Sequence, residues 1–306
     1  MFDSLLDLIS VCRQEIVNSP YVTLQLENLS FFYDSIKGAE VPSHSYLLHP
    51  KSSSITHNMF DFTFNASLNG GYYYYDNGNI KQWNINGSGS NALFNWIDKI
   101  RENHLMPLYD IKSCDIYQSL SPYLRNVPYA AKRLKICSEF SDNQKFNQLD
   151  DFVFKLINQD SIHVSFETIN NLIQIYPEGF AEDPFKKKAI LALIFFTDHL
   201  ENLGKKVIWE AGLAVDYQIP RILTWANVIK LSDYALDLLK SDKLLSVSSD
   251  FVIHYRAATL LAVEELSKQT NVSSKKIDGV LFNKFRKDSN FLKNSPPNMK
   301  IDEMWF

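Results

Sequence analysis

The chain has 306 residues, and the 45% that are hydrophobic are enough to fill a substantial core. Its formal net charge of -4 argues against a surface that wraps polyanions, because avid nucleic-acid binders carry a basic excess or stripe, and the lysine run at 186–188 is too short to supply one. The three cysteines have no spacing typical of a zinc site, and their odd number argues against a disulfide framework. The sequence shows neither a signal peptide nor a membrane-spanning apolar run, so we expect a cytoplasmic protein without membrane contact.

The first ninety residues mix helical and extended patterns. We expect a helix at the start, a strand-like segment at Tyr21–Leu24 and a second helix around residues 29–36. Phe60, Phe62 and Phe64 alternate as in a strand, and the residues Asp-Asn-Gly-Asn at 76–79 separate two further strand-like runs, which is a strong hairpin signal. Residues 60–85 are therefore predicted to form a small antiparallel sheet.

From residue 91 onward the apolar spacing is mainly helical. A central helix is expected between Pro184 and Leu203, with Gly204 as its C-terminal cap, and another from about residue 250 to 268. We therefore predict a mainly α-helical globular domain with a small antiparallel sheet or hairpin in its N-terminal third. This single domain would span residues 1–306, with a mixed part at 1–90 and a helical part at 91–306.

One acidic residue lies directly before the N-terminus of a predicted helix. Pro220 suits the first helical turn, where its missing N–H costs nothing, and an apolar stripe follows it at Ile222, Leu223, Ala226 and Ile229. Asp216 therefore lies just outside the helix. A carboxylate there can cap the helix, sit in solvent, or serve as a functional group.

The segment around Asp216 resembles the signature of the queuosine salvage protein family. That signature is Ala-Asp-Tyr-Arg, an aliphatic residue and Pro, followed by a helix that leads to Tyr-Ser-Asp. Residues 215–220 (Val-Asp-Tyr-Gln-Ile-Pro) and 231–233 (Leu-Ser-Asp) match it, with Gln218 in place of the arginine. The resemblance continues in the same order elsewhere in the chain.

Three further segments carry this resemblance. Residues 60–65 are similar to the family's Leu-Asn-Phe-x-Phe-Trp, residues 176–183 to its Phe-Pro-Ser-Phe-x-Asp, and residues 254–256 to its Glu-x-Arg helix. A DNA-glycosylase-like arrangement of helices is one architecture that the resemblance allows.

The resemblance implies a hydrolase that cleaves the N-glycosidic bond of queuosine 5'-monophosphate and releases queuine for tRNA modification. Asp216 would be the catalytic carboxylate, because a carboxylate near the anomeric carbon stabilises an oxocarbenium-like transition state and can activate water. The expected partner is this small nucleotide or a close analogue, with no cofactor, no metal and no direct nucleic-acid contact. The sequence leaves the oligomeric state open.

Several residues are candidates for binding the nucleotide. Aromatic side chains suit a flat base, and a guanidinium can hold a phosphate through two hydrogen bonds. The resulting set of predicted substrate-binding residues is Phe62, Asp61, Phe64, Tyr217, Glu210, His254, Arg256 and His44. A structural alternative exists for the main candidates: the phenylalanines can be core residues, and Arg256 can form an ion pair with Glu264 on one helical stripe.

Some positions depart from the family pattern. These positions are Asn65, Val207, Gln218, His254 and Asn298. They motivate a second hypothesis, in which the chain is a non-catalytic or re-specialised protein that binds a modified base or nucleotide.

Overall fold

A computed structural model describes residues 3–39, 52–84, 90–93, 95, 97, 128–302 and 304. Helices dominate it and the described strands pair in twos, so the prediction of a mainly α-helical protein is confirmed. Buried apolar side chains from the beginning to the end of the described chain form one continuous cluster. None of the described helices is long and apolar enough to cross a membrane. The single-domain boundary at 1–306 stays a prediction.

The N-terminal elements follow the predicted order. α1 (Leu5–Val17) begins with a capping box and is followed by β1 (Val22–Leu24). The expected second helix is divided into a 3-10 helix, η1 (Leu26–Phe32), and a short α2 (Tyr33–Lys37).

The predicted strand at Phe60, Phe62 and Phe64 is wrong, because these residues lie in a helix, α3 (Ile55–Leu68). All but one of residues 58–68 are buried, so this part of α3 lacks the polar face by which a helix is recognised in a sequence. The alternation of its phenylalanines therefore does not indicate a strand. Phe60 and Phe64, four residues apart, stack with ring centroids 6.3 Å apart, whereas Phe62 faces α10 (Lys187–Asn202).

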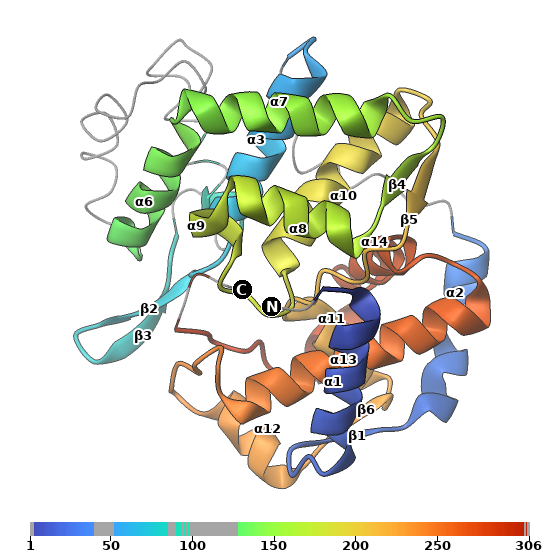
Figure 1. The fold of residues 1–306 in the computed structure, drawn as a ribbon. Helices are drawn as coiled ribbons and strands as arrows, with labels where there is room; N and C mark the ends of the chain where they lie inside the picture. The colour runs from blue at the N-terminus through green and yellow to red at the C-terminus, as the bar shows by residue number, and fades with distance from the viewer. Residues whose placement is uncertain are drawn as a thin grey trace.

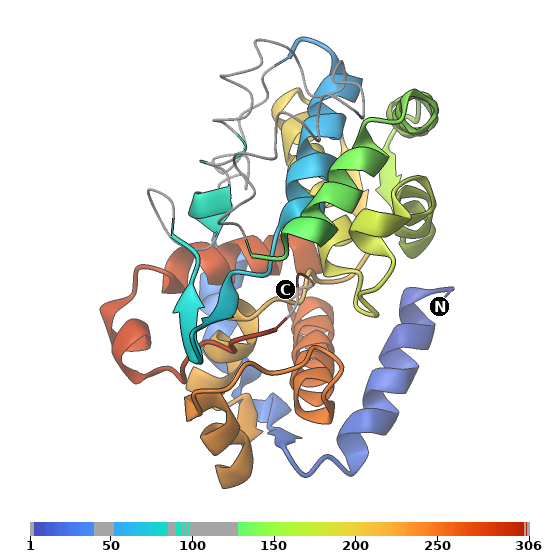
Figure 2. The same ribbon diagram turned by 90° about the vertical axis from the view of Figure 1, so that its left-hand side faces the viewer.

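The predicted hairpin is confirmed. β2 (Tyr73–Asp76) pairs antiparallel with β3 (Asn79–Gln82). Asn77 and Gly78 form the turn with φ values of 50° and 81°, which is the left-handed pair that a type I′ turn requires. The hairpin projects from the helices on the side opposite α1 (Figure 2).

A first group of elements surrounds α3 and α10 in the upper half of Figure 1. Its other members are α6 (Ala130–Phe140), α7 (Asn143–Ile157), β4 (Ile162–Val164), α8 (Phe166–Ile175), α9 (Pro177–Phe180) and β5 (Val207–Trp209). β4 and β5 pair in parallel.

α10 is the central helix that the sequence predicts, since it is buried along most of its length and packs along α3. It ends in a Schellman motif, in which the N–H groups of Gly204 and Lys205 donate to the carbonyls of Glu201 and Leu200 at 2.9 and 3.0 Å. Gly204 has φ +80°, as a C-terminal cap requires.

A second group lies below the first in Figure 1 and contains α1, α2, β1 and most of the C-terminal third. Its C-terminal elements are α11 (Gln218–Trp225), β6 (Ile229–Leu231), α12 (Asp233–Lys240), α13 (Asp250–Thr270), α14 (Ser274–Phe285) and α15 (Ser289–Asn294). α1 packs along α13, and β1 pairs antiparallel with β6.

The apolar stripe predicted after Pro220 is shorter than expected. α11 ends at Trp225, and the chain turns at Asn227, whose φ of 57° is left-handed. Ile229 therefore belongs to β6 and not to the helix.

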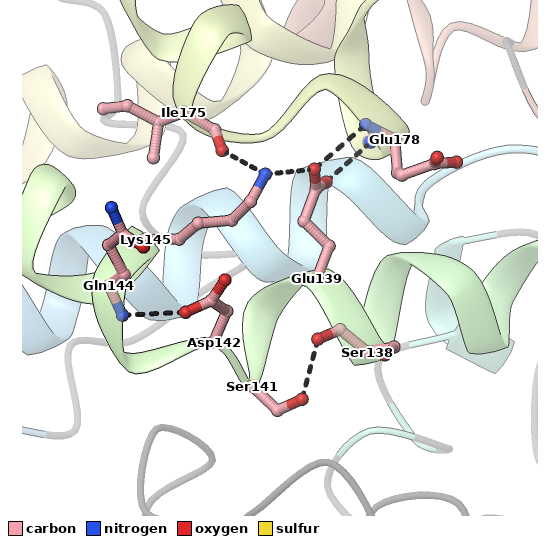
Figure 3. Close-up of polar contacts among 9 residues, drawn as sticks. Ser138, Glu139, Ser141, Asp142, Gln144, Lys145, Ile175 and Glu178 are labelled. Atoms are coloured by element: carbon pink, nitrogen blue, oxygen red, sulfur yellow. Dashed lines mark hydrogen bonds and ion pairs between the residues drawn. The ribbon is translucent and has the colours of Figure 1, made fainter.

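A buried carboxylate joins three helices of the first group (Figure 3). Glu139 of α6 accepts the N–H groups of Glu178 and Gly179 at 3.3 Å each, and Lys145 of α7 donates to it at 2.6 Å and to the Ile175 carbonyl at 2.8 Å. Burial raises the pKa of Glu139, and Lys145 acts against that rise. This network holds α6 and α7 against the α8–α9 junction.

Candidate functional site

Asp216 lies in the loop between β5 and α11, and its side chain faces the start of that helix. Its Oδ1 atom accepts the N–H groups of Gln218 at 2.7 Å and Ile219 at 3.4 Å, so the carboxylate satisfies two of the amides that a helix start leaves unpaired. Its Oδ2 atom accepts no hydrogen bond from the described residues, and the residue is partly exposed. Among the described residues, the helix start thus fixes Oδ1 but not Oδ2.

The charge state of Asp216 depends on a neighbouring lysine. Burial raises the pKa of Asp216, and the charge of Lys187, the two amides and the charge of Arg256 act in the opposite direction. A carboxylate with a raised pKa is a stronger base toward water than an ordinary aspartate.

Lys187 is the first residue of α10 and is only 5% exposed. Burial lowers the pKa of its ammonium, and the charges of Asp216 and Asp183 oppose this effect. Within the part of the chain that the structure describes, the ammonium makes no hydrogen bond. The sequence showed only a short run of lysines here, whereas all three are buried.

Tyrosines surround Asp216 on the side of the hairpin. Tyr72 precedes β2, interacts electrostatically with Asp216 and donates its hydroxyl hydrogen to Asn69. Tyr217, next to Asp216, interacts with Tyr72 and Tyr73. Burial raises the pKa of each of these tyrosines, so they remain protonated donors.

Arg256 forms a buried ion pair instead of facing open space. Its Nη1 and Nη2 atoms contact the two carboxylate oxygens of Asp183 at 2.6 and 2.9 Å, and Nη2 also donates to the Val215 carbonyl at 3.1 Å. The residue is 1% exposed and lies over the Phe185 ring. The partner of Arg256 is therefore Asp183, where the sequence suggested Glu264, and its contact with a phosphate stays a prediction.

Phe62 and Phe64 are core residues in this structure. Phe62 is 1% exposed and packs toward Phe195 of α10, and Phe64 is 3% exposed and meets Phe140 of α6. Their contact with a base stays a prediction. Asp61 is the only partly exposed residue of this segment of α3.

A family model described as queuosine salvage protein matches residues 202–306, which include Asp216, α11 and Arg256. The C-terminal third of the chain is thus similar to the queuosine salvage protein family. A search of curated proteins finds no match. This match connects the chain with queuosine salvage and with a small, queuosine-related molecule.

Two further candidate residues are not among the groups that act on Asp216. Glu210 is exposed at the end of β5. His254 faces α1, where its Nδ1 atom lies 2.8 Å from Ser19 Oγ and its Nε2 atom lies 3.1 Å from Glu15. The third candidate, His44, lies outside the described residues.

Two of the departures from the queuosine salvage pattern lie near the tyrosines. The Gln218 side chain hydrogen-bonds with Tyr217 and accepts from Arg221 Nη1 at 3.3 Å. Asn298 hydrogen-bonds with Tyr73, while its buried Oδ1 atom has no partner among the described residues. These changed residues therefore alter the polar groups beside Tyr217 and Tyr73.

Proposed function

We propose that this protein hydrolyses the N-glycosidic bond of queuosine 5'-monophosphate and releases queuine. The observation that carries the proposal is the arrangement of Asp216, which belongs to the family's signature. One of its oxygens is held by the start of α11, the other is free of hydrogen bonds from the described residues, and the buried Lys187 lies beside it.

The chemistry needs a carboxylate that acts on the sugar. N-glycoside hydrolysis passes through an oxocarbenium-like state, and Asp216 would stabilise the positive charge at the anomeric carbon and orient or deprotonate the attacking water. Queuine has carbon where purines have N7, so its departure cannot be assisted by protonation there. Lys187 would keep Asp216 ionised and donate hydrogen bonds to the substrate.

Buried positive charge favours an anionic substrate. Arg133 and Lys188 are buried near the start of α10, where they donate to backbone carbonyls at the end of α3. Burial lowers the pKa of Lys188 well below its usual range, and it also lowers the pKa values of Arg133 and Lys187. A bound monophosphate would favour the charged forms of these side chains, which is why we expect an anionic substrate.

The test is release of the base by purified protein. Wild type, Asp216→Asn and Asp237→Asn are each incubated with queuosine 5'-monophosphate, and free queuine is measured by mass spectrometry. Asp237 is a matched control because it is an exposed aspartate on α12. We expect Asp237→Asn to match wild type and Asp216→Asn to lose on the order of 10³-fold in rate. Full activity of Asp216→Asn would show that the catalytic assignment is wrong.

A non-catalytic binding protein is the second candidate function. The unpaired Asn298 oxygen and the Gln218 substitution favour it, because both change the polar groups next to the tyrosines. Titration calorimetry with the nucleotide separates the two functions. A wild-type protein that binds queuosine 5'-monophosphate but releases no queuine would establish the binding function.

A further inference from the structure

We propose that Asp183 and Arg256 form a positioning pair, which fixes the Asp216 carboxylate and the Lys187 ammonium relative to each other. This inference rests on the proposed function, in which these two groups act together on the substrate. Neither member of the pair would touch the substrate itself.

Asp183 holds the start of α10. Its Oδ1 atom accepts the N–H of Phe185 at 3.1 Å, and its Oδ2 atom accepts the N–H of Lys187 at 2.8 Å. Between them, Lys186 takes a left-handed conformation with φ +54°, which is costly for a residue with a side chain and must be held by its surroundings. The Asp183 carboxylate therefore determines the position from which the Lys187 side chain extends at the start of α10.

Arg256 holds the loop that carries Asp216. Its Nη2 atom donates both to Asp183 at 2.9 Å and to the carbonyl of Val215, the residue directly before Asp216, at 3.1 Å. The Phe185 ring covers the guanidinium, with its carbon 4.3 Å from the ring centroid. A continuous set of hydrogen bonds thus runs from Lys187 through Asp183 and Arg256 to the Asp216 loop.

The pair also acts on the two groups through its charge. The positive charge of Arg256 lowers the pKa of both Asp216 and Lys187, while Asp183 raises the pKa of Lys187. Burial raises the pKa of Asp183 itself, but the charge and hydrogen bonds of Arg256 outweigh it and keep Asp183 ionised. Asp183 therefore carries its negative charge beside Arg256 at neutral pH.

Stability alone does not account for such a pair. Both side chains are almost fully buried, at 1% and 2% exposed, and the cost of desolvating two charges commonly equals what their attraction returns. Well-packed apolar residues of similar volume often replace a buried ion pair without loss of stability. A pair that holds the backbone at Lys187 and directly before Asp216 has a further role in geometry, because small displacements of reacting groups have large effects on rate.

The experiment replaces the pair and compares it with a second buried pair. The test variants are Asp183→Asn, Arg256→Lys and the double variant Asp183→Leu with Arg256→Met. The control is the double variant Asp198→Leu with Lys275→Met, which removes a buried ion pair of 2.7 Å between α10 and α14, apart from Asp216. For each protein, the melting temperature, kcat, KM and the pH dependence of kcat/KM are measured.

We expect the test variants to lose about 10- to 100-fold in kcat while KM changes by less than about threefold, since positioning acts on the chemical step. The acid limb of the pH profile should move to higher pH in the apolar double variant, because the charge of Arg256 no longer lowers the pKa of Asp216. Arg256→Lys keeps the positive charge, so its acid limb should stay at the wild-type pH while its kcat still falls. The control pair should leave kcat unchanged.

Two outcomes would overturn the positioning role. One is a kcat that falls no further in the test variants than in the control at equal folded fraction, and the other is an unchanged acid limb in the apolar double variant.

If wild type releases no queuine, the same question is answered by carbon NMR of the Asp216 carboxyl, whose signal is identified by its loss in Asp216→Asn. Its pKa must then rise when Arg256 is replaced by Met, and an unchanged pKa contradicts the proposal.

Discussion

At the scale of single residues, Asp216 combines two roles that the sequence presented as alternatives. Its Oδ1 atom caps α11, and its Oδ2 atom accepts nothing from the described residues. The cap fixes the orientation of the carboxylate, so the structural role supports the proposed catalytic role. A group that is buried for function commonly costs stability.

Replacement of Asp216 by Asn should therefore stabilise the protein at neutral pH. The asparagine oxygen can still accept the Gln218 N–H, but it carries no charge to desolvate. Because the folded pKa of Asp216 is raised, the wild type is penalised only as the pH rises through that pKa. The melting temperature of Asp216→Asn should exceed that of wild type at pH 7, and the difference should vanish below about pH 4. If Asp216→Asn is less stable than wild type at pH 7, the negative charge of Asp216 does not destabilise the folded protein and the prediction is wrong.

The roles of Lys187 and Arg256 could not be read from the sequence. Lys187 appears there as part of a short lysine run, and no local pattern shows that Asp216, 29 positions later, lies close to it. Arg256 was assigned to a phosphate or to Glu264, because its real partner, Asp183, lies 73 positions away and follows no helical spacing. Asp216 was found because both the Pro220 helix start and the family signature lie in one segment.

At the scale of elements, local signals decided which predictions succeeded. The hairpin was predictable from the Asn77-Gly78 turn, since few residues accept two left-handed positions in succession. The helical period and Gly204 were enough for α10. α3 was missed because tertiary burial on all sides removes the polar face that identifies a helix in a sequence.

The burial of α3 makes Phe62 a stability residue. Phe62→Ala should lower the free energy of unfolding by about 3–5 kcal/mol, because it opens a cavity against α10. Phe154→Ala on α7 is the control, since that ring is 65% exposed and should cost much less. Urea denaturation measures both. A Phe62→Ala protein of wild-type stability but with raised KM would instead support the substrate-binding role first predicted for this ring.

At the scale of the whole molecule, charge argues for a free nucleotide and against tRNA as the substrate. The net charge is -4, and the cations near Asp216 are buried at the start of α10 instead of spread over a surface. Polyanions bind through many exposed basic side chains, whereas one phosphate needs only a few enclosed ones.

Intact tRNA that contains queuosine should therefore release no queuine. The same tRNA, digested by nuclease to 5'-mononucleotides, should release it in proportion to its queuosine content. Mass spectrometry of the free base measures both reactions, and an undigested tRNA without queuosine gives the background. Release from intact tRNA at a rate similar to that from the mononucleotide would contradict the expectation.

The proposed mechanism places the Asp216 carboxylate at the anomeric carbon of the nucleotide. A crystal structure of the Asp216→Asn variant with uncleaved queuosine 5'-monophosphate tests it most directly. We expect the anomeric carbon to lie about 3–4 Å from the side chain of residue 216 or from a water bonded to it, with Lys187 in contact with the substrate. A nucleotide bound elsewhere, or bound with its sugar turned away from residue 216, would contradict it.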